Sequence, residues 1–134
     1  MMDHFLIIEV VQILVGAFLG IGMTQSGLDK IIDWQGNRSW LRDHFSKTNL
    51  SPFVTPMLMI VLILEVTGGL ILIFGTGMGI VYGDNSYILI GLMIIAVNLL
   101  ALFFGQRLAK DYEGAAVLVN YFILTIIGLL TFHI

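Results

Sequence analysis

Two polar side chains lie inside long apolar segments of this sequence, where they are costly to place. Glu65 is near the middle of the apolar run from Pro56 to Gly75, and Asn98 is inside another such run. An acidic group at the centre of a bilayer costs roughly 2.5–3.5 kcal/mol on insertion scales, so such groups are typical of ligand sites and proton relays. These residue types can hydrogen-bond one another, and Glu65 is the one that could also exchange a proton.

Further polar side chains extend this pair into a layer. At a rise of about 1.5 Å per residue, Glu65 and Asn98 lie roughly 10–15 Å from the helix ends that share one side of the membrane. Lys30 is expected at the edge of the layer, with its ammonium directed toward the lipid head groups. Shallower members, roughly 5–8 Å deep on the same estimate, are Gln25, Ser26 and Asn120.

Two interpretations of the layer remain open at this point. In the first, Glu65 is protonated and the polar groups bond one another, which stabilises the bundle by about 0.6–2 kcal/mol per contact. In the second, they line a cavity that binds a ligand head group or relays a proton.

Four apolar segments must position these residues, and each is predicted to be a membrane-spanning helix. An α-helix of this length can cross a hydrocarbon core of about 30 Å. The predicted spans cover about residues 5–28, 53–75, 86–105 and 115–132. A glycine-rich turn is predicted over residues 76–85.

A polar segment at about residues 34–47, between the first two spans, carries tryptophan and basic side chains. That composition favours a short interfacial helix, with a binding loop as the alternative. The predicted fold is therefore an all-α membrane protein, a bundle of four transmembrane helices with a short interfacial helix between helices one and two. It forms a single domain over residues 1–134.

Glycines at helical spacing predict the faces on which the helices approach one another. Gly16 and Gly20 form a Gly-x-x-x-Gly pattern, and Gly91 and Gly105 each stand seven residues from Asn98. Small residues allow close backbone approach, so these faces are expected to point into the bundle. The predicted packing glycines are Gly16, Gly20, Gly27, Gly68, Gly69, Gly91 and Gly105.

Composition excludes several classes of protein. Hydrophobic residues make up 58% of the chain and charged residues 11%, against about 25% charged residues in soluble domains. A net charge of −3 predicts no nucleic-acid partner. The absence of cysteine excludes thiolate catalysis and iron–sulfur clusters. No catalytic residue, metal site or covalent cofactor is predicted, and a quinone or a lipid is the expected ligand of any cavity.

The distribution of charge predicts an orientation. All 6 basic residues lie in the segments that join spans one to two and three to four. The positive-inside rule therefore places both segments in the cytoplasm and both termini on the opposite, periplasmic side.

Three stretches of the sequence resemble the DoxX family. They are Ser26-Gly27-Leu28-Asp29-Lys30, then Glu65-Val66-Thr67-Gly68-Gly69-Leu70 with Gly75, and Gln106-Arg107-Leu108-Ala109-Lys110-Asp111-Tyr112-Glu113-Gly114. The resemblance covers nearly the whole chain and implies a four-helix protein of the prokaryotic inner membrane. Its relatives include the DoxD-type membrane subunits of archaeal thiosulfate:quinone oxidoreductase.

These observations predict a small integral subunit of a larger membrane assembly, respiratory or quinone-linked, with a structural or quinone-pocket-shaping role. Other membrane-protein subunits and the lipid bilayer are its expected partners. The alternative is a stand-alone binder or carrier of a small lipophilic molecule that uses the layer around Glu65. Without ligands for a redox centre, the chain is not expected to be catalytic on its own.

Overall fold

The computed structural model describes residues 4–47 and 51–133, and this part of the chain is helical almost throughout. Its elements are α1 (His4–Ile32), α2 (Trp34–His44), the short 3-10 helix η1 (Ser51–Phe53), α3 (Val54–Tyr82), α4 (Ser86–Leu108) and α5 (Tyr112–Leu130). Four of the helices, α1, α3, α4 and α5, are long and apolar enough to cross a membrane. The predicted all-α fold, with four spans and a short helix between the first two, is confirmed.

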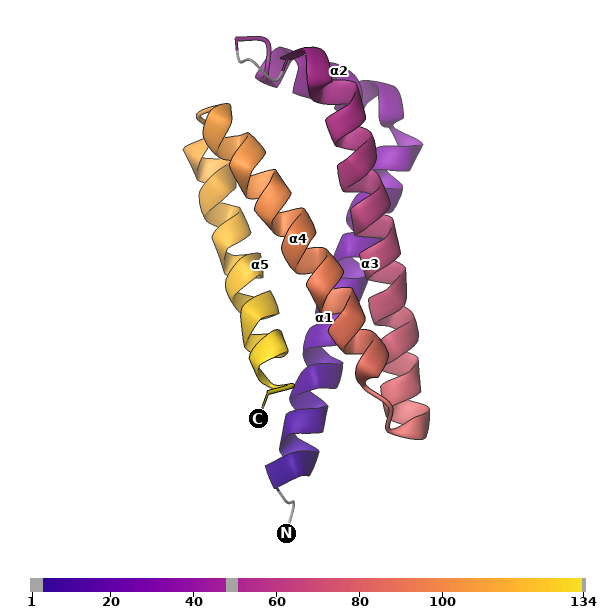
Figure 1. Cartoon of the computed structure of the whole chain (residues 1–134). Coiled ribbons are helices and arrows are strands. Elements are labelled where there is room, and N and C mark those ends of the chain that lie inside the picture. Colours follow the sequence, from indigo (N-terminus) through magenta and orange to yellow (C-terminus); the bar gives the residue numbers. More distant parts are fainter. Residues whose placement is uncertain (1–3, 48–50, 134) are drawn as a thin grey trace.

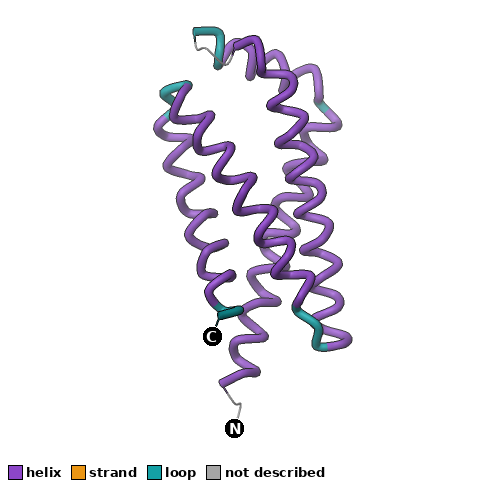
Figure 2. Tube along the Cα trace, viewed as in Figure 1, coloured by secondary structure: helices purple, strands orange, loops and turns teal. Residues whose placement is uncertain are grey.

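The four long helices run up and down, and α2 lies across one end of the bundle (Figure 1). The turn between α4 and α5 is at the same end as α2, whereas both chain termini lie at the opposite end. Helix α1 packs mainly on α3, α3 on α4 and α4 on α5, while α1 and α5 touch little. The α4–α5 pair diverges from α1 and α3 toward the α2 end, as the tube trace shows (Figure 2).

The outer surface of the bundle is apolar. Leu14, Ile80 and Leu100, on three different spans, are 63%, 67% and 60% exposed. Water would make such surfaces unfavourable, whereas a hydrocarbon core accommodates them. The chain is therefore a multi-pass membrane protein whose outer face contacts the lipid bilayer.

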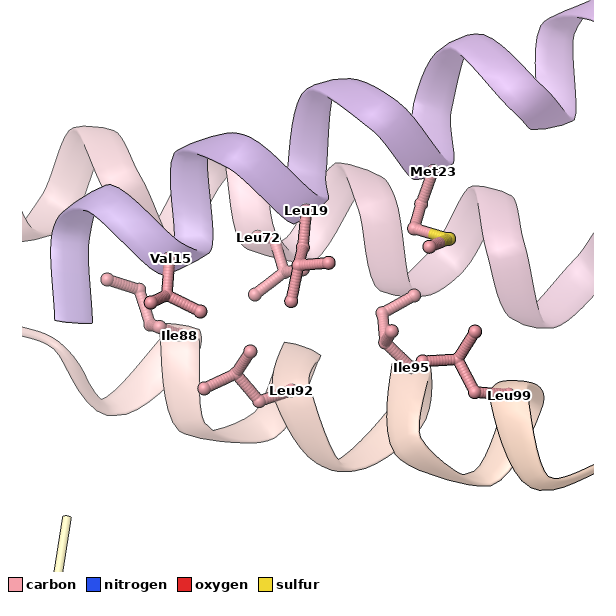
Figure 3. Close-up of a cluster of buried hydrophobic side chains, with 8 residues drawn as sticks. All are labelled: Val15, Leu19, Met23, Leu72, Ile88, Leu92, Ile95 and Leu99. Atoms are coloured by element: carbon pink, nitrogen blue, oxygen red, sulfur yellow. The ribbon is translucent and has the colours of Figure 1, made fainter. Parts of the chain in front are cut away.

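A small core of apolar side chains lies where α1, α3 and α4 meet (Figure 3). Leu72 of α3 is fully buried at its centre, against Gly91 of α4. The members of this core are Val15, Leu19, Met23, Leu72, Ile88, Leu92, Ile95 and Leu99.

Most of the predicted packing glycines lie at close helix contacts. A Cβ atom at Gly69 would be 2.9 Å from the backbone nitrogen of Thr24, which leaves no room for a side chain. Tight or overlapping contacts of the same kind occur at Gly16, Gly20, Gly27, Gly68 and Gly91. Gly105 differs, because its nearest neighbour would be the ring of Phe45 at an ordinary 3.6 Å.

Helix α3 is longer than predicted, because it continues to Tyr82. The predicted glycine-rich turn is wrong for residues 76–82. Glycine in a helix interior costs about 1 kcal/mol relative to alanine, but here close packing offsets that cost. A Cβ atom at Gly75 would lie 2.8 Å from the backbone nitrogen of Ile88. The helix ends only at Gly83, whose φ of 69° is left-handed.

The other spans also differ from their predicted limits. Helix α1 reaches Ile32 rather than residue 28, α4 reaches Leu108, and α5 runs from Tyr112 to Leu130. Asp33 then separates α1 from α2 and caps α2, since its carboxylate accepts a hydrogen bond from the Gly36 N–H at 3.3 Å. The boundary between α1 and α2 is thus set by a local capping residue and not by a fall in the hydropathy of the sequence.

Helix α2 is held over the end of the bundle by polar and apolar contacts. The Nε of Arg38 donates to Thr55 Oγ1 of α3 at 3.1 Å. His44 Nε2 is 3.5 Å from Asp111 Oδ2 in the α4–α5 turn, close enough for an ion pair when His44 is protonated. Phe45, just beyond α2, is buried beside Gly105 of α4. Helix α2 therefore bridges both halves of the diverging end.

Candidate functional site

The central feature of the candidate site is a hydrogen-bonded cluster between α1 and α3. Lys30 Nζ lies 2.9 Å from Glu65 Oε2 and 3.2 Å from Oε1. The same ammonium donates to Ser26 Oγ at 2.8 Å, and the Ser26 hydroxyl lies 3.3 Å from Glu65 Oε1. The Glu65 side chain is 4% exposed and that of Lys30 is 19% exposed. Three polar side chains that the sequence placed in one layer are thus brought together.

The direction of Lys30 differs from the prediction. Its ammonium was expected to reach the lipid head groups, and this is wrong, because it turns inward to Glu65. Side chains on an α-helix lean toward the N-terminus of the helix, so Lys30 extends back over the turn that carries Ser26. The buried carboxylate then supplies a stronger partner than the head groups that a snorkelling lysine reaches.

Asn98 is the second unusual group. Its side chain is completely buried, and neither Oδ1 nor Nδ2 has a hydrogen-bond partner in the described part of the chain. A buried amide left without partners costs about 1–3 kcal/mol. Such a group needs an explanation in a ligand, a water molecule or a second conformation.

The packing of α3 on α4 places Asn98 opposite Glu65. Close contacts along this pair join Gly75 to Ile88, Leu72 to Gly91, and Gly68 to Ile95. Each step moves one helical turn down α3 and one turn up α4, as two antiparallel helices require. The next step of the same register pairs Glu65 with Asn98. The carboxylate instead bonds to α1, which leaves the amide unpartnered.

The remaining predicted site residues lie outside the cluster. Gln25 is exposed and lines a cavity next to Ser26. Asn120 of α5 is exposed and lines none of the cavities around Glu65. The polar layer therefore comes from α1, α3 and α4, and α5 does not extend it through Asn120.

Two cavities meet at the cluster. One of about 400 Å³ lies between α1, α4 and α5 and reaches Phe18 and Tyr121. The other, of about 310 Å³, lies beneath α2 and reaches Trp40 and Gln106. Residues that line both are Ser26, Glu65, Leu102 and Leu118. Both volumes are in the range of small-molecule sites, about 300–1,000 Å³.

Sequence reasoning missed several residues of these cavities. Gln106 Oε1 is buried without a hydrogen-bond partner among the described residues, and it lines the cavity beneath α2. Gln106 directly follows Gly105 on the α4 seam that also carries Asn98, and this position could have indicated it. No such signal marks Trp40 or Tyr121, because their roles depend on how far the helices diverge.

The arrangement can bind the polar head and the apolar body of an amphipathic molecule. Its polar end presents the Lys30 ammonium, the Glu65 carboxylate, the Ser26 hydroxyl and the amides of Gln25 and Gln106. The walls are mainly aliphatic and aromatic. Within residues 4–47 and 51–133, no group of three or more His, Cys, Asp or Glu side chains could hold a metal ion. Comparisons with protein-family models, with curated proteins and with solved structures found no match to this chain.

Proposed function

We propose that this protein binds a small amphipathic molecule, with its head group at the Lys30–Ser26–Glu65 cluster and its apolar body in the adjoining cavities. The observation that carries this proposal is the meeting of two cavities at one buried ion pair. In a bundle stabilised only by packing, an ion pair at the end of a cavity would add little stability, because the cost of removing both charges from water offsets most of their attraction.

Access from the bilayer supports a lipophilic ligand. Phe18 and Ile21 line the larger cavity and are 60% and 54% exposed on the apolar outer surface. A molecule dissolved in the lipid could enter between α1 and α5, which touch each other little. A water-soluble ligand would have to pass beneath α2 instead.

A quinone is a ligand that the DoxX resemblance suggests. A quinone carries carbonyl oxygens that can accept from Lys30, and its tail is apolar. Membership of the DoxX family, and with it a link to a quinone-dependent respiratory system, is part of this proposal and rests on the three sequence stretches alone.

One observation favours the second candidate function, an accessory role in a larger membrane assembly. Asn120 is exposed on the outer surface of the α5 span. Lipid tails cannot bond an amide, so a polar group of another subunit is the proposed partner. In mild detergent, a respiratory subunit should co-purify with the wild type and be lost from Asn120→Leu. Equal recovery from both would remove this second function.

The proposed orientation places α2 and the α4–α5 turn in the cytoplasm of a prokaryotic cell, with both termini periplasmic. The support is that all 6 basic residues belong to segments at the α2 end of the bundle. A reporter that is active only in the cytoplasm should therefore stay inactive when fused to the C-terminus. An active fusion would reverse the orientation.

The test of ligand binding uses a photoreactive dodecanol and the full-length protein in zwitterionic lipid nanodiscs. Leu118 lines both cavities, so Leu118→Trp should fill them and abolish labelling of their walls. Its neighbour Val117 is 54% exposed, so Val117→Trp is the matched control and should label like the wild type. Equal labelling of the two variants would contradict the proposal.

A further inference from the structure

The Glu65 carboxyl has a second candidate hydrogen-bond partner, Asn98, on the helix α4 that packs against its own helix α3. In the observed arrangement it bonds to Lys30 and Ser26 of α1. The register of α3 on α4 places it opposite Asn98, whose donor and acceptor are both without partners among the described residues. An amide can accept from a protonated carboxyl and donate to its carbonyl oxygen at the same time.

The two members of the ion pair differ in how a ligand would reach them. Both side chains line the cavity beneath α2, but that of Lys30 is 19% exposed and that of Glu65 only 4%. A head group that enters this cavity therefore meets the ammonium first. An anionic head group would compete with Glu65 for it, and the strongest competitor for a carboxylate is another anion.

When a ligand displaces Glu65 from Lys30, the carboxylate loses its counter-charge. A carboxylate buried without a counter-charge is strongly unfavourable, so it takes up a proton from solution instead. The other ionisable group at these cavities is Tyr121 of α5, while the lining residues of α2 and α4 carry no ionisable side chain. No other charged group in the cavity walls could therefore balance the displaced carboxylate.

We infer that the site binds the anionic head of a single-chain amphiphile at Lys30 and that Glu65 takes up a proton and turns to Asn98 as it does so. This inference rests on the proposed function and names its ligand class. The charges balance, because the ligand brings one negative charge and solution supplies one proton. Neutral head groups, quinones included, bind without this exchange.

The test measures proton uptake with a permanently charged probe. Dodecyl sulfonate stays ionised at neutral pH, so any proton taken up on binding belongs to the protein, and dodecanol is the neutral control. Titration calorimetry of the full-length protein in nanodiscs, in two buffers of different ionisation enthalpy, counts the protons. We expect about one proton per sulfonate bound and none per dodecanol, as charge balance at a buried site requires.

Three variants separate the parts of this inference. Asn98→Leu should weaken sulfonate binding about tenfold and leave dodecanol binding unchanged, because one hydrogen-bonded partner is lost. Glu65→Gln should bind sulfonate without proton uptake. Val97→Leu, a leucine at the exposed neighbouring position of α4, should behave like the wild type in both respects.

The outcomes are distinguishable. Sulfonate binding without proton uptake would overturn the inference, and so would unchanged behaviour of Asn98→Leu and Glu65→Gln. Binding of dodecanol but not of sulfonate would also overturn it, while the proposed function would stand. If neither amphiphile binds, the proposed function fails as well.

Discussion

At the end of the bundle that carries both termini, the amide of Asn85 donates a 2.7 Å hydrogen bond to Gln12, whereas in the half toward α2 the amide of Asn98 has no partner in the described chain. The helices also pack more closely at the end that carries the termini than in the half toward α2. Gly75 meets the backbone of Ile88 at a distance that admits no side chain, but Gly105 has ordinary space around it.

This contrast shows where a site can form in a small helix bundle. Close glycine contacts fix the crossing point of α3 and α4 near the termini, and the helices diverge from there toward α2 (Figure 2). Divergence opens the cavities and leaves the Asn98 amide without any partner among the described residues, whereas the Asn85 amide at the tight end lacks a partner for its oxygen alone. The tight end stabilises the fold, and the open end provides the space and the polar groups for a ligand.

The largest effect is expected from breaking the ion pair at the open end. Lys30→Met removes the only ammonium that contacts Glu65 among the described residues and leaves a buried carboxylate unpaired. The free energy of unfolding should fall by about 3 kcal/mol, the low end for a buried pair, because Lys30 is partly exposed. Unfolding in mixed detergent micelles measures it, with exposed Lys47→Met as the control. No loss in Lys30→Met would mean that proton uptake by Glu65 offsets the loss of its counter-charge.

A single methyl group at the tight end should have the next largest effect. Gly75→Ala places a Cβ atom 2.8 Å from the Ile88 backbone nitrogen, so one of the two helices must move. We expect a loss of about 2 kcal/mol in unfolding free energy, as is typical of overpacking. Gly77→Ala, two residues further on, meets nothing within 4 Å and is the matched control. It should gain up to about 1 kcal/mol, because alanine favours helix.

Amides at the two ends should respond oppositely to the same substitution. Asn85→Leu leaves the buried Gln12 oxygen without its donor, so it should lower the unfolding free energy by about 1 kcal/mol. Asn85 makes no side-chain capping bond to α4, so loss of a cap cannot explain that result. Asn98→Leu removes an unpartnered amide and should stabilise the protein or leave it unchanged. Equal losses would indicate that Asn98 does have a partner.

The sequence predicts the fold because length and hydropathy are local properties. Four apolar stretches long enough to span a bilayer, separated by polar segments, allow few architectures. The end of α3 could not be predicted in this way. Gly75, Thr76, Gly77 and Gly79 indicate a turn by their local preference, and the contacts of Gly75 with α4 and of Gly79 with α1 keep this stretch helical.

The site could be predicted only in part, for a similar reason. The cost of burying Glu65 indicated a polar layer, and Lys30 does contact Glu65, while the register of α3 on α4 puts Asn98 opposite it. Which partner the carboxylate selects depends on side-chain direction and helix divergence, which sequence spacing does not encode. Asn120 has the same residue type as Asn98 and the same predicted depth as Ser26, but it faces outward.

The smallest effect concerns Asp84, in the turn between α3 and α4 at the tight end. The Ser86 hydroxyl and the Ser86 backbone N–H donate to its carboxylate at 2.6 and 3.0 Å. These hydrogen bonds, the hydroxyl first, hold the pKa of Asp84 below its ordinary value, against a weaker opposing effect of desolvation. A carboxyl whose pKa is lower in the folded state stabilises the fold above its unfolded pKa, and it loses that contribution as pH falls through the folded pKa.

Ser86→Ala tests this turn directly, because it removes the hydroxyl donor and keeps the backbone one. The pKa of Asp84, followed by carboxyl NMR in detergent micelles, should rise toward the ordinary aspartate value in this variant. The acid loss of stability that Asp84 contributes should begin at correspondingly higher pH and be smaller in total. Ser39→Ala, on exposed α2, is the control and should leave the Asp84 titration unchanged. An unchanged pKa in Ser86→Ala would show that the backbone donor alone holds the pKa of Asp84 down.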